Sequence, residues 1–172
     1  DVLRASAPAA AAEDFHRASL RIAEHLELPV EVRAMHAAHA HDVFHALVLL
    51  ETVGDRAIAR GDGVSAARAL RRALDLARRD LARGYLGESE GAVVIFARKL
   101  GEALMLCGDV IEAEGVLREG LGVAPRGSVE QLRLDGVLAR ILHDRRRLLE
   151  AQRLLEADVA AAQRKGFRAV AA

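Results

Sequence analysis

Tryptophan and asparagine are missing from this sequence of 172 residues, which has only one cysteine and three prolines. The single cysteine cannot form an internal disulfide, so we expect a reducing compartment and a cytoplasmic location. Only 3% of the residues are aromatic, which leaves few side chains that could stack on nucleic-acid bases. No apolar run approaches the roughly 18 residues of a membrane-spanning helix. These absences argue against a disulfide-rich secreted protein, a nucleic-acid-binding protein and a membrane protein.

Net charge is also missing. Lysine plus arginine number 25, and so do aspartate plus glutamate, so no overall field attracts a polyanion or an anionic membrane. The sequence has no glycine-rich phosphate loop, no zinc-protease motif and no pairing of nucleophile and base that indicates catalysis. We therefore predict that the protein is not an enzyme and needs no cofactor.

What the sequence does contain is a strong helical pattern, dominated by alanine, leucine, arginine and glutamate. Even the strand-like run Ala92–Phe96 continues into the helical pair Leu100 and Leu104, so we assign it to a helix. Ser128 followed by Gln131 is typical of a capping box and predicts a helix that starts directly after Ser128. The pattern and its turn signals predict eight helices, over residues 13–27, 30–39, 42–60, 64–83, 91–107, 110–122, 129–144 and 148–165.

The chain divides into three predicted parts. Residues 1–12 are expected to be a loose segment rich in alanine and proline, residues 13–41 a pair of helices, and residues 42–172 an array of about three repeats. The chain begins at Asp1 rather than at methionine, so we expect a processed protein or a part of a longer one.

A spacing of small and large residues recurs along the chain. The segment 101–121 aligns without gaps with the segment 54–74, so that its glycine, its Gly-Asp turn and its leucines are superimposed. It also aligns with a third copy, 139–159, in which two arginines replace the Gly-Asp turn. A weaker fourth copy has Asp42 in its turn and Ala46 as its small residue. Copies in register predict stacked hairpins of antiparallel helices.

At these residues the chain resembles the tetratricopeptide repeat family. That family has Leu-Gly, a large residue, a small alanine, a large apolar residue and a closing proline. The corresponding residues here are Leu100-Gly101, Leu104, Ala113, Leu117 and Pro125. Ala97 stands where the family prefers tryptophan, and Gly120 where it prefers alanine. The resemblance implies an all-α fold, a right-handed superhelix of stacked antiparallel helix hairpins.

The resemblance also implies a function in protein–protein interaction. In this family the first helix of each hairpin lines a concave surface that binds a protein or peptide. The family's binding positions correspond here to Val48, Glu51, Asp55, Ile95, Arg98, Glu102, Met105, Arg133, Arg140 and His143. Their mixed charges suit a partner with both charges, and homodimer formation is compatible with such an array. Because no asparagine is present, the clamp by which some members hold a terminal carboxylate is not expected.

The copies are longer than the family's usual repeat of about 34 residues. Such lengthened repeats are similar to those of large bacterial signalling proteins, including Ser/Thr kinases and ATPase-type transcription regulators. The resemblance therefore implies that the chain is a scaffold module of a kinase-linked or ATPase-linked protein. An alternative function is the ligand-sensing arm of a transcription regulator, which would need an enclosed pocket.

Four histidines close together in the sequence support a further alternative, a metal-dependent enzyme. They are His36, His39, His41 and His45. On one continuous helix, His36 and His39 would point roughly 140–180° away from His45. We therefore interpret the four histidines as part of a helix junction in which Asp42 is the N-cap, and we predict no bound metal.

Two other features are interpreted as structural. Cys107 has no base near it in the sequence, so we predict a buried, unreactive thiol. Four arginines share one face of the predicted helix 64–83, namely Arg68, Arg72, Arg79 and Arg83. Because Asp75 lies in the same stripe, we predict a solvated outer face rather than a nucleic-acid site.

Overall fold

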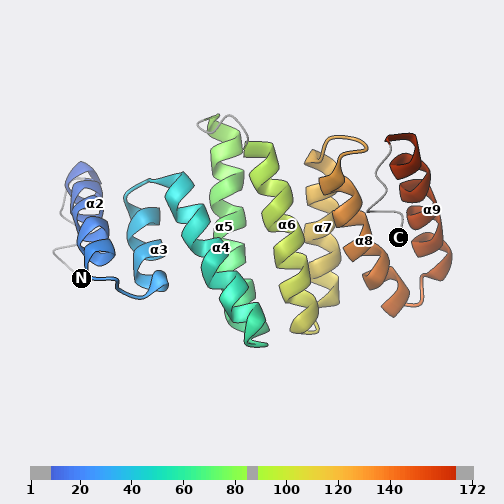
Figure 1. Ribbon diagram of the computed structural model, residues 1–172, viewed down its shortest axis with the longest axis horizontal. Helices are drawn as coiled ribbons and strands as arrows, with labels where there is room; N and C mark the ends of the chain where they lie inside the picture. The colour runs from blue at the N-terminus through green and yellow to red at the C-terminus, as the bar shows by residue number, and fades with distance from the viewer. Residues whose placement is uncertain (1–8, 85–88, 166–172) are drawn as a thin grey trace.

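The computed structural model describes residues 9–84 and 89–165, which form helices and no strand. The helices are α2 (Ala9–His25), α3 (Val30–His39), α4 (Val43–Ala59), α5 (Gly63–Arg83), α6 (Ser89–Leu106), α7 (Val110–Val123), α8 (Val129–Asp144) and α9 (Leu148–Lys165). Figure 1 shows them in chain order from α2 at one end of an elongated molecule to α9 at the other. The predicted all-α fold class is confirmed.

The eight predicted helices are all present, and most of their ends agree within one or two residues. The exception is the start of α2, because the predicted loose segment 1–12 is helical from Ala9 onward. Four consecutive alanines explain this error, since alanine has the highest helix propensity of all residues. The rest of that predicted segment, residues 1–8, lies outside the described residues. In the described ranges, no helix is both long enough and apolar enough to cross a bilayer.

The helices pack in a linear order. Each helix contacts the next one in the chain, and α6 also packs against α8. α4 with α5, α6 with α7, and α8 with α9 therefore form three hairpins at the positions of the three sequence copies. The weaker fourth copy is the pair α3 and α4, which shares α4 with the first hairpin and so is not a separate unit.

The turns that join these helices repeat one backbone geometry. The turns α3–α4, α4–α5, α6–α7 and α8–α9 each contain one residue with a positive φ angle. These residues are His41 (55°), Gly61 (73°), Gly108 (78°) and Arg146 (59°). The next residue donates its N–H to the carbonyl five residues earlier, as Asp109 does to Leu104 at 2.9 Å. This hydrogen bond satisfies a carbonyl at the helix end. Glycine adopts a positive φ angle without strain, which explains the Gly-Asp sequence of two of the turns.

The aspartate in these turns caps the helix that follows. Asp42, Asp62 and Asp109 each accept a hydrogen bond from the backbone N–H three residues later, at 3.2, 3.0 and 3.3 Å. Ser128 caps α8 in the same way, through the N–H of Gln131 at 3.0 Å. The predicted caps at Asp42 and Ser128 are therefore confirmed. They fix where each helix begins by satisfying an N–H that has no partner within the helix.

The small residues of the sequence copies lie where two helices of a hairpin come closest. A Cβ atom at Gly101 would lie 2.8 Å from the Leu117 side chain, and one at Gly54 would lie 2.7 Å from the Leu70 side chain. Both leucines are completely buried. The first two copies thus share the same contact, in which a leucine of the second helix covers a glycine of the first. This contact explains the spacing found in the sequence.

Candidate functional site

The ten predicted partner-binding residues all lie on α4, α6 and α8, the first helices of the three hairpins. We call this set the first-helix face, and it consists of Val48, Glu51, Asp55, Ile95, Arg98, Glu102, Met105, Arg133, Arg140 and His143. None of the ten is buried. Two are exposed apolar residues in equivalent positions of successive copies, Val48 at 44% and Ile95 at 40%. Exposed apolar side chains among charged ones are available to a binding partner.

Lys99 connects the predicted residues of α4 to α6. Its amino group lies 2.8 Å from Glu51 and 2.7 Å from Asp55, and its side chain is only 15% exposed. Burial lowers the pKa of Lys99, but hydrogen bonds to Asp55 and Glu51 outweigh this and leave the pKa above its ordinary value. The sequence analysis did not identify Lys99 because only the fold places it beside two carboxylates of another helix, distant in the chain.

Further contacts lie on α6 and between α6 and α8. Arg98 pairs with Glu102 one turn later at 2.7 Å, and Arg140 donates to the Met105 sulfur at 3.5 Å. Together with the ion pairs of Lys99, these side-chain contacts involve six of the ten predicted residues.

The remaining four predicted residues stand apart from these contacts. They are Val48, Ile95, Arg133 and His143. Over residues 9–84 and 89–165, the side chains of Arg133 and His143 make no hydrogen bond or ion pair to another member of the first-helix face. His143 instead lies 3.6 Å from Asp144.

Charge changes along the first-helix face. α4 contributes two carboxylates, Glu51 and Asp55, and α6 contributes both signs. α8 contributes two exposed arginines, Arg133 and Arg140, which make no ion pair within the described residues. The face therefore runs from acidic on α4 to basic on α8, although Lys99 offsets part of the acidic charge. Such a gradient favours an extended partner of complementary charge order over one that carries a single sign.

Ion pairs join the second helices of successive hairpins. Arg71 of α5 pairs with Glu112 of α7 at 2.6 Å, and Arg118 of α7 pairs with Glu150 of α9 at 3.0 Å. The repeat alignment superimposes these two pairs, because arginine and glutamate recur at equivalent positions of the copies. The sequence analysis missed the pairs although the alignment contained this signal. Arg78 adds another α5–α7 pair with Glu119.

Glu114 is the centre of a larger charge cluster between α7 and α9. Its side chain is 10% exposed and contacts Arg118 at 2.8 Å, Arg147 at 2.6 Å and Arg145. Burial raises the pKa of the Glu114 carboxyl, but hydrogen bonds from Arg118 and Arg147 outweigh it and leave the pKa below its ordinary value. The run of arginines after α8 thus connects the last turn to the preceding hairpin.

The predicted histidine cluster is divided among different surroundings. His36 and His39 lie against His16 of α2, with a ring nitrogen contact of 2.9 Å to His36 and ring stacking at 4.7 Å with His39. His45 instead faces Glu24 at 3.2 Å, and His41 occupies a turn. In the described ranges, no three histidine, cysteine, aspartate or glutamate side chains are placed to hold a metal ion. The sequence analysis missed His16 because it belongs to a separate helix, far from the other histidines in the chain.

Cys107 does not have the predicted environment. Its side chain is exposed at the C-terminal end of α6. The predicted burial was wrong because Cys107 falls after the last residue of the helix, in the turn, and not on the face that packs against α7.

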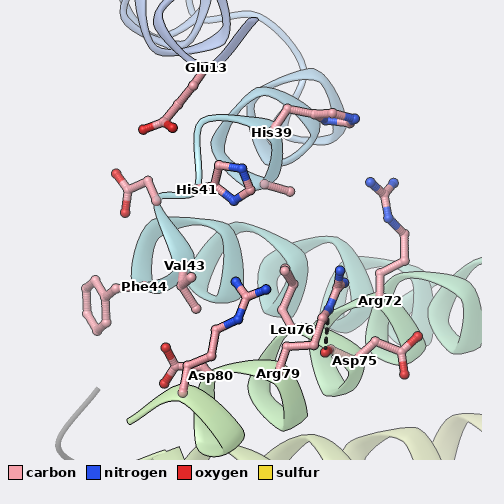
Figure 2. A pocket seen from close by; sticks show the side chains of 13 residues that line it. Glu13, His39, His41, Val43, Phe44, Arg72, Asp75, Leu76, Arg79 and Asp80 are labelled. Atoms are coloured by element: carbon pink, nitrogen blue, oxygen red, sulfur yellow. Dashed lines mark hydrogen bonds between the residues drawn. The ribbon is translucent and has the colours of Figure 1, made fainter. Parts of the chain in front are cut away.

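The four arginines of the α5 stripe are exposed, as predicted, but three of them also line a hollow that the sequence did not predict. Arg72, Arg79 and Arg83 line a hollow of about 940 Å³ between α5 and the turn from α3 to α4, while Arg68 lies outside it. Figure 2 shows Arg72 and Arg79 extending from α5 toward the segment that carries His39 and His41. The hollow was not found in the sequence because α3 and α5 are separate in the chain.

No family model matches the chain, and no curated protein matches it significantly.

Proposed function

We propose that this chain is a tetratricopeptide-like module that binds a protein or peptide across the first-helix face. In this proposal the three hairpins stack as a right-handed superhelix, and their first helices line its concave side. Helical repeats bury their apolar faces by stacking and leave an extended surface for a partner. The repeated Gly54–Leu70 and Gly101–Leu117 contacts support the proposed relationship to the family.

The observation that carries the proposal is the composition of the first-helix face. Positions on the first helices of three successive hairpins are accessible, carry two exposed aliphatic side chains and change from acidic on α4 to basic on α8. The partner proposed is an extended segment with basic residues over α4, acidic residues over α8 and an apolar residue near Ile95. A role within a larger bacterial signalling or regulatory protein, linked to a kinase or an ATPase, is part of the same proposal.

Charge reversal on α8 tests this assignment. The variant Arg133→Glu with Arg140→Glu should bind the partner at least about thirtyfold more weakly, because losing one desolvated charge contact typically costs about 2 kcal/mol. Both arginines are exposed, so the free energy of unfolding should change by less than about 0.5 kcal/mol. The matched control is Arg68→Glu with Arg153→Glu, which changes the net charge equally on exposed residues outside the face.

The measurement is affinity capture from a lysate of the source organism with the wild type and both variants, followed by titration of the purified partner. The proposal predicts that the control retains the partner and that the α8 variant loses it. Retention by the α8 variant together with loss by the control would place the interaction elsewhere on the molecule.

A further inference from the structure

The hollow beside α5 contains four carboxylates, and each of them already has a donor. The contacts are Glu13 with Arg17 at 2.5 Å, Asp42 with the N–H of His45 at 3.2 Å, Asp75 with Arg78 at 2.8 Å, and Asp80 with the Ser89 hydroxyl at 2.6 Å. Arginines compensate the charges of Glu13 and Asp75, whereas Asp42 and Asp80 accept hydrogen bonds from neutral donors. The acidic groups of the hollow are therefore committed to contacts within the chain.

The arginines of the hollow are not committed in this way. Arg72, Arg79 and Arg83 make no ion pair with any described residue, and Arg79 uses only its Nε atom, on the Asp75 carbonyl at 3.0 Å. On the same helix, Arg71 and Arg78 are both paired with carboxylates of α7. Two arginines of α5 therefore pair with carboxylates of α7. The other three line the hollow and form no ion pair with a described residue.

The remaining lining of the hollow favours an anion with an apolar part. Val43 and Phe44 belong to the first turn of α4 and supply apolar side chains to the lining. Phe44 is 68% exposed, although a large aromatic side chain usually loses most of its exposure on folding. Phe44 of α4 and Leu76 of α5 are thus apolar parts of the lining.

We propose that this hollow binds a small organic anion. Its phosphate or carboxylate group is held by Arg79 with Arg83 or Arg72, and its apolar or aromatic body lies against Phe44 and Leu76. Arg79 and Arg83 are four residues apart on one helix face, so both guanidinium groups reach the same anion. Guanidinium forms bidentate hydrogen bonds with phosphate and carboxylate. A volume of about 940 Å³ is sufficient for a ligand of this class.

Titration with simple probes tests the proposal at low ionic strength. Phenyl phosphate and phenylacetate supply the two anionic groups on the same ring, and inorganic phosphate supplies the anion alone. At least one aromatic probe should bind the wild type at millimolar concentration, with shifts of the Phe44 and Leu76 amide signals in NMR spectra. The tighter aromatic probe identifies the anionic group. Absence of binding by both at 10 mM would overturn the proposal.

Matched variants show whether the hollow is the site. Arg79→Gln with Arg83→Gln should weaken probe binding at least tenfold, while Arg68→Gln with Arg153→Gln, which removes the same charge, should change it less than twofold. Equal weakening in the two variants would mean general attraction of anions and would overturn the proposal. Helix content and melting temperature of both variants confirm that each is folded.

The apolar part of the lining has its own test. Phe44→Ala should reduce binding of the better aromatic probe to the level of inorganic phosphate, because only the anionic contact remains. If this variant binds the aromatic probe as the wild type does, the assignment of Phe44 and Leu76 is wrong. The proposal is independent of the proposed function, since the probe titrations involve no residue of the first-helix face and partner capture involves no residue of the hollow.

Discussion

The hairpins α6–α7 and α8–α9 occupy equivalent positions in the repeat alignment, but different forces hold them. In the first, Leu117 is completely buried over Gly101. Leu155, the equivalent residue of the second, is 46% exposed, although Ala139 and Ala151 are buried as the alignment predicts. α8 packs on α7, whereas no described helix lies beyond α9. The full burial of this leucine therefore needs the following hairpin as well as its own.

Charges add to apolar packing around the last hairpin, whose buried residues include Leu138, Ile141 and Ala151. Arg145 and Arg147 connect the turn before α9 to Glu114 of α7. Arg118 of α7 pairs with Glu114 and also with Glu150 of α9. A carboxyl pair, Asp135 of α8 with Asp158 of α9, lies between the two helices of the hairpin. Because ion pairs at the surface contribute little each, we expect α8–α9 to be the weaker of the two hairpins. The difference shows how a repeat adapts when one side of it is not covered.

Leucine truncation should give the largest effect. Leu117→Ala removes a completely buried side chain and should lower the free energy of unfolding by about 2–5 kcal/mol. Leu155→Ala should lower it by less than about 1 kcal/mol, because this side chain is half exposed and leaves little cavity. Denaturant melts of the two variants measure both values. Similar losses would show that the two hairpins are packed alike.

Filling the glycine contact should have the next largest effect. Gly101→Ala places a Cβ atom 2.8 Å from Leu117, and the resulting overpacking should cost about 1–3 kcal/mol. Gly115→Ala on α7 is the control, because a Cβ there meets no atom within 4 Å in the described structure. This substitution should stabilise the protein by about 0.5–1 kcal/mol, since alanine is the better helix former. A stabilising Gly101→Ala would contradict the contact.

The carboxyl pair should make the last hairpin sensitive to pH. Burial and the facing Asp135 raise the pKa of Asp158 to about 7, above its ordinary value of 3.8. The native state then binds more protons than the unfolded state between these values, so the free energy of unfolding decreases as the pH rises toward 7. We expect a decrease of about 1 kcal/mol, because water screens a partly exposed pair.

Asp158→Asn provides the control for this pH dependence. Asparagine keeps the shape and the hydrogen bond of a protonated aspartate but does not ionise. Its melts between pH 5 and 8 should lack the decrease in the free energy of unfolding that we expect in the wild type. The lower limit of pH 5 excludes Glu114, whose pKa is lowered and whose contribution is lost only at more acid pH. An unchanged slope in Asp158→Asn would assign the pH dependence to another group.

The smallest effect is expected at the last turn. Arg146 has a φ angle of 59°, and it occupies the position that Gly61 and Gly108 occupy in the turns of the other two hairpins. Arg146→Gly should relieve this strain and stabilise the protein by up to about 1 kcal/mol, less the entropy that glycine adds to the unfolded chain. Gly108→Ala should destabilise it by about 1 kcal/mol for the opposite reason. Chemical denaturation of both variants tests whether the turns are equivalent.

Much of the architecture could be predicted from local patterns in the sequence. Helix ends followed from caps such as Ser128 and from the Gly-Asp turns, because these act within a few residues. The Gly101–Leu117 contact was implied by the spacing of small and large residues. The partial exposure of Leu155 does not follow from the alignment, because the burial of this residue depends on a neighbouring hairpin and not on its own repeat.

The contacts of the candidate site were less accessible to sequence reasoning. The family resemblance selected residues of the first-helix face but not Lys99, which links two helices through carboxylates distant in the chain. The stripe that includes Arg72 and Arg79 is exposed as predicted, but the hollow beside it could not be found by considering its helix alone. The hollow forms only when the turn from α3 to α4 lies against α5.

Native-state hydrogen exchange tests most directly whether the array holds its hairpins by different forces. We predict that amides in the middle of α5 and α7 exchange only on global unfolding, whereas those of α9 exchange through a local opening of lower free energy. Adding about 0.5 M NaCl should lower the opening free energy of α9 further, because salt screens the pairs around Glu114, and should leave α5 and α7 unchanged. Equal protection of α7 and α9, with no effect of salt on either, would contradict this account.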